Sequence, residues 1–293
     1  MLTNKSTLDP VSGEKSRFNQ AKIEIAHRNG VEYPPKVTQA ESGLFTSNQT
    51  MNDMNEDKVY STPRDSIAAF EFDGQVADVF ENMISRSVPG YPLLLDLLEV
   101  LTERFAQPNT NCYDLGCSLG ASTLRIRQHL PQSCHIIGVD TSPSMVERCK
   151  NNMMRDRSSA TADIRLASLQ ETKIENASIV ALNYTLQFVP DDERIKILTH
   201  IADGLIPGGI LILSEKIRFE DELVQSATTE LHHAFKKHQG YSDLEIAQKR
   251  ASLENVLIPN TLEQHTERLS AAGFSSADMF LKCINFVSLV AIK

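Results

Sequence analysis

The segment from Asn111 to Thr123 constrains the fold of this chain more than any other. A short apolar run ends at Asp114-Leu115-Gly116, and a helix-compatible run, Ala121 to Leu130, begins just after Gly120. This order predicts a strand, a tight glycine turn and a helix. Because Gly116 lacks a Cβ, the turn can take a positive φ and lie against a ligand, while the first amides of the helix point towards it. Taken alone, the stretch leaves open an ordinary turn between a strand and a helix.

The spacing of the two glycines indicates which nucleotide the turn would bind. A dinucleotide fingerprint needs G-x-G-x-x-G, so that pyrophosphate can sit on the helix N-terminus. Here Gly116 and Gly120 are separated by Cys-Ser-Leu, and the middle glycine is missing. Pyrophosphate is therefore disfavoured. The pattern Asp-x-Gly-x-x-x-Gly resembles the first motif of class I S-adenosylmethionine (SAM)-dependent enzymes, whose ligand carries a sulfonium and an amino-acid tail.

Strand and helix patterns alternate along the chain after this turn, which predicts a parallel sheet. The expected strands after the first are 135–140, 162–167, 178–184 and 209–215, and the expected helices are 143–153 and 191–204. Two more strand-like runs, 276–283 and 286–292, have a connection short enough for a hairpin. We therefore predict an α/β, Rossmann-like class I methyltransferase fold: a mostly parallel seven-stranded sheet, helices on both faces, and one antiparallel C-terminal strand.

The chain divides into two parts by composition. Residues 1–62 are rich in polar residues and have few apolar residues at helical or strand spacing, which predicts a mobile arm. A docking segment for a partner or a second copy is the alternative. Residues 63–293 are expected to form one SAM-binding domain, in which order begins near Phe70 and a polar helical insertion occupies about 219–256.

Charge and cysteine content narrow the classes of function. The chain has 38 acidic and 29 basic residues and no long basic run, so direct binding to nucleic acid is not expected and the substrate should be small. Its five cysteines form no C-x-x-C pair, which argues against a zinc site or a disulfide framework and suits a reducing cytoplasm. We expect no metal. Without a long apolar run, neither membrane insertion nor export is indicated.

Polar residues that end the predicted strands are the candidate ligand contacts. Ligands of open parallel sheets bind beyond the carboxyl ends of the strands. That rule places one set of residues around a single crevice: Gly116, Asp140, Ser168, Asn183 and Glu215. Asp140 can accept hydrogen bonds from both hydroxyls of a ribose, although it could instead cap the following helix. Asn183 can donate and accept around the amino-acid end of SAM.

Longer segments resemble one family more closely than the general class. They include Arg86-Ser87-Val88-Pro89-Gly90-Tyr91, Asp114-Leu115-Gly116-Cys117-Ser118-Leu119-Gly120-Ala121, Asn183-Tyr184-Thr185-Leu186-Gln187-Phe188, Leu213-Ser214-Glu215-Lys216 and Gln248-Lys249-Arg250. Together they are similar to the carboxy-S-adenosyl-L-methionine synthase family. The resemblance covers about Phe70 to Lys293, and its first and last segments are far more specific than the glycine loop.

The resemblance implies an unusual use of SAM. Members of that family carboxylate the methyl group of SAM with a carboxyl taken from prephenate, which becomes phenylpyruvate. The product, carboxy-SAM, then serves a separate enzyme that modifies the wobble uridine of tRNA (cmo5U34). The family resemblance also implies a homodimer. Carried over by motif, the ligand contacts are Tyr91, Gly116, Cys117, Ser118, Asp140, Thr141, Ser168, Leu169, Asn183 and Arg250.

Arg250 and Tyr91 are the residues assigned to the reaction by this resemblance. Carboxy-SAM differs from SAM by one carboxylate, and a guanidinium matches a carboxylate in two hydrogen bonds. A solvated helix charge and a loop aromatic are the alternative readings of Arg250 and Tyr91. Thr141 stands where the family usually has Asn, and Ser168-Leu169 where it commonly has Asp-Ile, so adenosine recognition should differ there. A small-molecule methyltransferase and a non-catalytic SAM-binding protein remain the competing functions.

Overall fold

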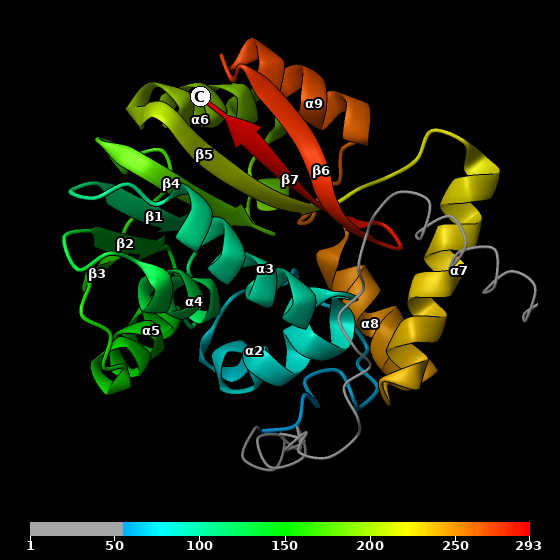
Figure 1. Ribbon diagram of the computed structural model, residues 1–293. Coiled ribbons are helices and arrows are strands. Elements are labelled where there is room, and N and C mark those ends of the chain that lie inside the picture. Colours follow the sequence, from blue (N-terminus) through cyan, green and yellow to red (C-terminus); the bar gives the residue numbers. More distant parts are fainter. Residues whose placement is uncertain (1–54) are drawn as a thin grey trace, which may run out of the picture. The chain divides into compact units, whose positions relative to one another are not determined.

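A seven-stranded sheet forms the centre of the computed structural model, which describes residues 55–293 (Figure 1). The strands are β1 (Asn111–Leu115), β2 (His135–Asp140), β3 (Thr161–Leu166), β4 (Ala177–Asn183), β5 (Leu205–Lys216), β6 (Ser276–Cys283) and β7 (Phe286–Ile292). Their order in the sheet is β3-β2-β1-β4-β5-β7-β6. Only β7 runs against its neighbours β5 and β6; the other pairs in this described sheet are parallel. The predicted fold class is confirmed.

Helices cover both faces of the sheet because the strand side chains alternate between two apolar cores. The helices are α2 (Gly74–Ser87), α3 (Tyr91–Phe105), α4 (Ala121–His129), α5 (Pro143–Arg155), α6 (Asp191–Gly204), α7 (Glu222–His238), α8 (Asp243–Leu253) and α9 (Leu262–Ala271), with a short 3-10 turn, η2 (Leu186–Phe188). Cys112 of β1 packs in one core with Leu98 of α3, and its neighbour Tyr113 packs in the other with Leu198 of α6 and Leu269 of α9. The strand period of two thus builds both layers.

The predicted elements match the observed ones because their end signals are local. Ser142 caps α5 by accepting the amide of Met145, and Pro143 fills the first helical position. A capping box between Ser242 and Glu245 begins α8 inside the predicted insertion. That insertion consists of α7 and α8, and α7 contacts both α8 and α2 (Figure 1). In the described residues, none of the helices is both long and apolar enough to span a membrane.

Residues 55–62 pack against the domain, although composition places them in the predicted arm. Val59 and Tyr60 are buried in an apolar cluster with Met83 of α2. The side-chain amide of Gln248 on α8 donates to the carbonyls of Tyr60 and Thr62. Two apolar side chains far from any periodic pattern are enough to anchor this stretch, so order begins before Phe70. Residues 1–54 of the predicted arm lie outside the described part of the chain.

Candidate active site

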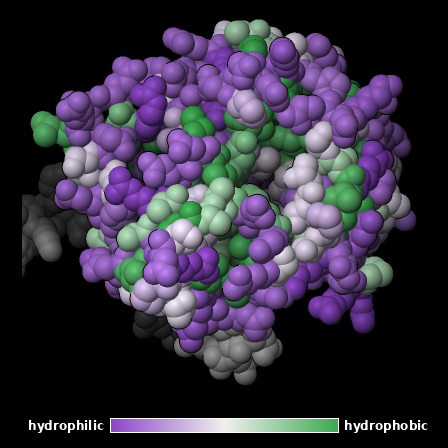
Figure 2. Space-filling model, turned by 180° about the vertical axis from the view of Figure 1, so that it is seen from behind, coloured by the Kyte–Doolittle hydropathy of each residue, from purple (hydrophilic) through white to green (hydrophobic). Residues whose placement is uncertain are grey.

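A cavity of about 730 Å³ lies at the carboxyl ends of the central strands, where the strand order reverses between β1 and β4. Eight of the ten predicted contacts line it: Tyr91, Gly116, Cys117, Ser118, Asp140, Thr141, Leu169 and Asn183. Ser168 and Arg250 are not among the lining residues. Seen from behind, the molecule is mostly hydrophilic, with apolar side chains gathered in a hollow near the middle of that face (Figure 2). The fold therefore brings most of the predicted site together.

The turn after β1 requires glycine at both predicted positions. Gly116 has a φ of 84°, and a Cβ there would collide with the side chain of Thr185. Gly120 has a φ of 90°, and its Cβ would lie 2.7 Å from the Sγ of Cys149. The amide of Gly116 donates to the carbonyl of Val139 on β2, at 2.8 Å. The bare backbone of this turn faces the cavity, as expected for a loop that lies against a ligand.

Asp140 organises the loop and the helix on either side of it. One carboxylate oxygen accepts the amide of Ser118 and the other accepts the amide of Ser142, both at 2.9 Å. Burial raises the pKa of this carboxyl, while the backbone amides of Ser142, Ser118 and Thr141 oppose that rise. Asp140 therefore holds the glycine turn and the segment before α5, while Ser142 is the N-cap of that helix. Each oxygen keeps a second lone pair for a ligand hydroxyl.

Asn183 and two tyrosines form the middle of the cavity. The Asn183 amide donates to the Ser122 hydroxyl at 3.1 Å, and its oxygen accepts the Ser214 hydroxyl at 2.8 Å. Tyr91 is buried at the first position of α3, and its ring centroid lies 6.4 Å from that of Tyr184. Burial raises the pKa of both phenols, so both stay neutral. These hydrogen bonds hold the Asn183 amide in one orientation beside the glycine turn.

Four phenylalanines make an apolar wall that the sequence analysis missed. Phe70, Phe72, Phe80 and Phe188 all line the cavity. The ring of Phe72 lies at the centre, 5.1 Å from Phe70, 6.0 Å from Phe80 and 5.3 Å from Phe188 between centroids. These rings come from three separate segments, so no local sequence pattern predicts that they form one wall. They give the cavity a surface suited to flat, apolar ligand groups.

The opposite end of the cavity is basic. Its lining contains Lys216 after Glu215 on β5, His232 and Lys236 on α7, and Lys249 on α8. Burial lowers the pKa of Lys236 to about 7 and that of Lys249 to about 8, and it also lowers the pKa of Lys216. His232 hydrogen-bonds the carbonyl of Ser87 at 2.9 Å, and burial lowers its pKa to about 3, so it is neutral. Helical spacing could have pointed to Lys236, because it follows His232 by four residues on α7.

Two predicted contacts lie outside the lining of the cavity. The Ser168 hydroxyl accepts the amide of Glu171 at 3.3 Å, within its own loop, while the next residue, Leu169, does line the cavity. Arg250 is exposed on α8, next to the buried Lys249. Its charge is close enough to contribute to the lowered pKa values of Lys216 and His233. Arg250 therefore lies beside the basic end rather than within it.

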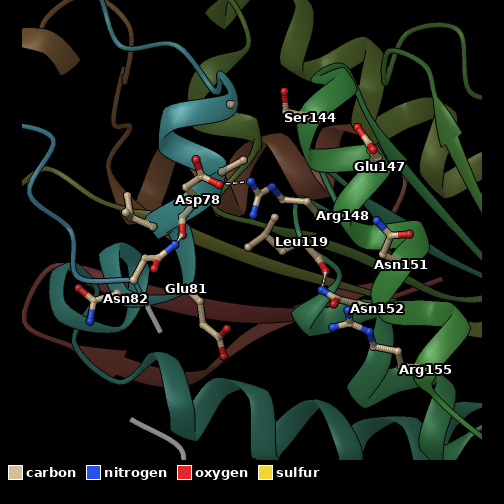
Figure 3. A pocket seen from close by; sticks show the side chains of 14 residues that line it. Asp78, Glu81, Asn82, Leu119, Ser144, Glu147, Arg148, Asn151, Asn152 and Arg155 are labelled. Carbon is tan, nitrogen blue, oxygen red and sulfur yellow. Dashed lines mark hydrogen bonds and ion pairs between the residues drawn. The ribbon is translucent and has the colours of Figure 1, made fainter. Parts of the chain in front are cut away.

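A second depression, of about 580 Å³, lies between α2 and α5 (Figure 3). Its walls are mostly polar, and an ion pair between Asp78 and Arg148 crosses it. The Asn152 amide donates to the carbonyl of Leu119 at 2.9 Å. None of the predicted contacts lines this depression. Among residues 55–293, no group of three or more His, Cys, Asp or Glu side chains is placed so that it could hold a metal ion.

The cavity thus combines a bare glycine turn, the Asp140 carboxylate and the fixed Asn183 amide. With the fold, this arrangement is typical of SAM-dependent enzymes of the class I methyltransferase type. A methyltransferase domain family matches residues 113–209. A putative O-methyltransferase from Nostoc punctiforme superposes with a TM-score of 0.55 at 21% identity, over 75% of this chain and 59% of that one. Human N-acetylserotonin methyltransferase gives 0.52 at 18% identity, over 75% and 55%. These structures support the fold alone.

Sequence relatives are much closer than the structural ones. Carboxy-S-adenosyl-L-methionine synthase of Marinobacter nauticus is 49% identical over 84% of this chain and 99% of its own length. The synthases of Vibrio campbellii and Trichlorobacter lovleyi are 51% and 52% identical, over 82% and 81% of this chain and 98% of their own lengths. The chain belongs to the carboxy-S-adenosyl-L-methionine synthase family.

Proposed function

We propose that this protein carboxylates the methyl group of SAM with a carboxyl group taken from prephenate, and releases carboxy-SAM, phenylpyruvate and water. The water forms from the hydroxyl that prephenate loses and the proton that the SAM methyl group loses. The observation that carries the proposal is identity of about 50% to carboxy-S-adenosyl-L-methionine synthases over nearly their whole length. The cavity supports it, because the predicted SAM contacts and a basic end open into the same space. When bound, SAM supplies a methyl carbon next to a sulfonium.

The chain's own residues bind, orient and shield the reactants in this proposal. Gly116 gives the ligand access to bare backbone, Asp140 accepts from the ribose hydroxyls, and Asn183 holds the amino-acid end. Arg250 binds the carboxylate of the product, with Tyr91 beside the reacting carbon. Phenylalanine side chains exclude water from the cavity, which strengthens each charged contact inside it. We assign no protein general base, since fragmentation of prephenate supplies one in the family.

The proposed product has a use outside this protein, in modification of the tRNA wobble uridine by a separate enzyme. A net charge of −9 supports an enzyme that does not itself bind nucleic acid, and five cysteines without a C-x-x-C pair support a cytoplasmic one. We also propose a homodimer in which the insertion, α7 and α8, helps to complete the site. Val224 and Leu231 on α7 support a partner surface there, because they are 43% and 55% exposed and, seven residues apart, lie on one helix face.

Mass spectrometry of the reaction with SAM and prephenate tests the function. The wild type should form a species heavier than SAM by one carboxyl group, dependent on prephenate. Arg250→Ala should form it at least about tenfold more slowly, because a charge-assisted contact contributes about 1.5–3 kcal/mol. Arg157→Ala, at another exposed arginine, is the matched control and should keep the wild-type rate. Plain SAM without a prephenate-dependent product would contradict the proposal in favour of a methyltransferase or a SAM-binding protein.

A further inference from the structure

Three lysines from distant parts of the chain bring their side chains to one end of the cavity. Lys216 is on β5, Lys236 on α7 and Lys249 on α8. Lys236 is 8% exposed and Lys249 is 7% exposed. Removing an ammonium group from water is costly unless a negative charge or hydrogen-bond acceptors replace the water. Two such buried groups, with the half-buried Lys216 beside them, therefore indicate an anionic ligand.

The described residues supply one negative charge to this cluster. Lys249 donates to the Ser87 hydroxyl at 3.1 Å, and its Nζ lies 3.8 Å from an oxygen of Asp57. Asp57 is buried and also accepts the hydroxyl of Tyr241 at 2.5 Å. Within residues 55–293, the ammonium groups of Lys216 and Lys236 form neither an ion pair nor a hydrogen bond. When all three lysines are protonated, three positive charges face one carboxylate, and two negative charges are missing.

The other acidic residues of the cavity do not fill this gap. Glu81 and Asp140 are the carboxylates that line the described cavity, and neither forms an ion pair with the three lysines. Asp140 is held by backbone amides at the nucleotide end. His232 adds no charge, since its neutral ring meets the carbonyl of Ser87. The low pKa values of Lys236 and Lys249 show the same imbalance, because burial and neighbouring cations favour loss of their protons.

We propose that Lys216, Lys236 and Lys249 form the subsite that binds the dicarboxylate carboxyl donor. This assignment rests on the proposed function. Two carboxylates match the two missing charges, whereas a monocarboxylate leaves one ammonium group buried without a counterion. The subsite therefore favours prephenate over phenylpyruvate, which keeps one carboxylate. Arg250 beside the cluster binds the transferred carboxyl group, and the lysines bind the donor that supplies it.

Calorimetric titration of prephenate into protein saturated with S-adenosylhomocysteine isolates donor binding, because that nucleotide has no methyl group to carboxylate. Lys236→Met keeps most of the unbranched side chain and removes its charge, and should bind prephenate at least about tenfold more weakly. Its affinity for S-adenosylhomocysteine should change less than about twofold. Lys237→Met is the matched control, since Lys237 is exposed and pairs with Asp243 outside the cavity. It should bind prephenate like the wild type.

Two further measurements separate a ligand contact from a structural role. Prephenate should bind to the wild type with uptake of protons at pH 7.5, seen by repeating the titration in buffers of different ionisation enthalpy, and Lys236→Met should take up fewer. The preference for prephenate over phenylpyruvate should shrink in the same variant. Lys236→Met should melt no lower than the wild type, since it removes a buried charge.

The outcomes of these measurements distinguish the lysine subsite from the proposed function on which it rests. If the wild type neither binds prephenate nor makes the carboxylated product, the proposed function is wrong. If the wild type does both, and Lys236→Met binds prephenate with unchanged affinity and unchanged proton uptake, the lysine subsite is wrong while the function stands.

Discussion

The two ends of the cavity differ in the groups that meet the ligand. At the nucleotide end, Gly116 and Asp140 offer backbone and one carboxylate, tied together by backbone hydrogen bonds. At the basic end, Lys216, Lys236 and Lys249 offer charged side chains, with one carboxylate among them. Binding at the nucleotide end depends on backbone shape, so it should weaken when a Cβ is added to the glycine turn. Binding at the basic end depends on charge, so it should weaken when the lysines lose their protons.

The largest expected effect on ligand affinity comes from adding a side chain at Gly116, where the ligand would lie against bare backbone. Gly116→Ala places a Cβ against Thr185 in a turn with positive φ. We expect SAM affinity to fall about 100-fold, since strain and collision of this kind cost on the order of 1–3 kcal/mol. Calorimetric titration with S-adenosylhomocysteine measures it.

Gly273→Ala separates strain from collision in this experiment. Gly273 has a φ of 95°, but a Cβ there would meet nothing within 4 Å. This variant should lose about 1 kcal/mol of stability and bind the nucleotide normally. Equal loss of affinity in both variants would mean that Gly116 acts through general stability and not through contact with the ligand.

A smaller effect is expected from pH, which should change ligand affinity at the basic end and not at the nucleotide end. The lysines bind the donor as ammonium groups, and their pKa values of about 7 for Lys236 and about 8 for Lys249 lie within the working range. Donor affinity should therefore fall several-fold to about tenfold between pH 7 and 8, as protons leave the free protein. The other charged or titratable groups beside them are Asp57, Arg86, Lys216, His232, His233, Tyr241 and Arg250.

Titrations of prephenate and of S-adenosylhomocysteine at both pH values test this contrast. Nucleotide affinity should stay nearly constant, and the donor profile should flatten in Lys236→Met. A donor affinity that is level between pH 7 and 8 would show that the lysines do not carry the interaction.

The nucleotide end could be predicted from the sequence because its signals are short. Strand, glycine turn and helix follow one another within Asn111 to Thr123, and Asp140 ends the next strand along the chain. Periodicity and caps placed the strands within a few residues, including the hairpin that makes β7 antiparallel. Such features depend on neighbours in the chain, so one sequence is enough to infer them.

The basic end could not be predicted as a unit, because tertiary packing assembles it. Asp57 lies in a stretch that reads as polar and unstructured, yet Val59 and Tyr60 anchor it so that its carboxylate reaches Lys249. In Gln248-Lys249-Arg250 the motif draws attention to the exposed Arg250, while helix geometry buries its neighbour. A pattern shows that a residue faces inward, but not which charges from other segments meet it there.

Glu215 lies between the two ends and should affect stability without affecting either ligand. It is buried at the end of β5, where it accepts the amide of Leu186 at 3.0 Å, and burial raises its pKa from 4.5 to about 8. The folded protein therefore holds this proton to a higher pH than the unfolded chain. Its contribution to stability is complete below about pH 4.5 and is lost as the pH rises through about 8.

Glu215→Gln should remove that dependence and keep the acceptor for Leu186. Between pH 5 and 8, the unfolding free energy of the wild type should fall relative to the variant by about 3–4 kcal/mol, measured by urea unfolding at each pH. Glu230→Gln, at an exposed position of α7, should follow the wild type. Nucleotide and donor affinities at pH 7 should change less than about twofold, because Glu215 supports the turn behind Asn183 without lining the cavity. A large loss of affinity for the nucleotide alone, or for the donor alone, would show that Glu215 acts in the binding of that ligand.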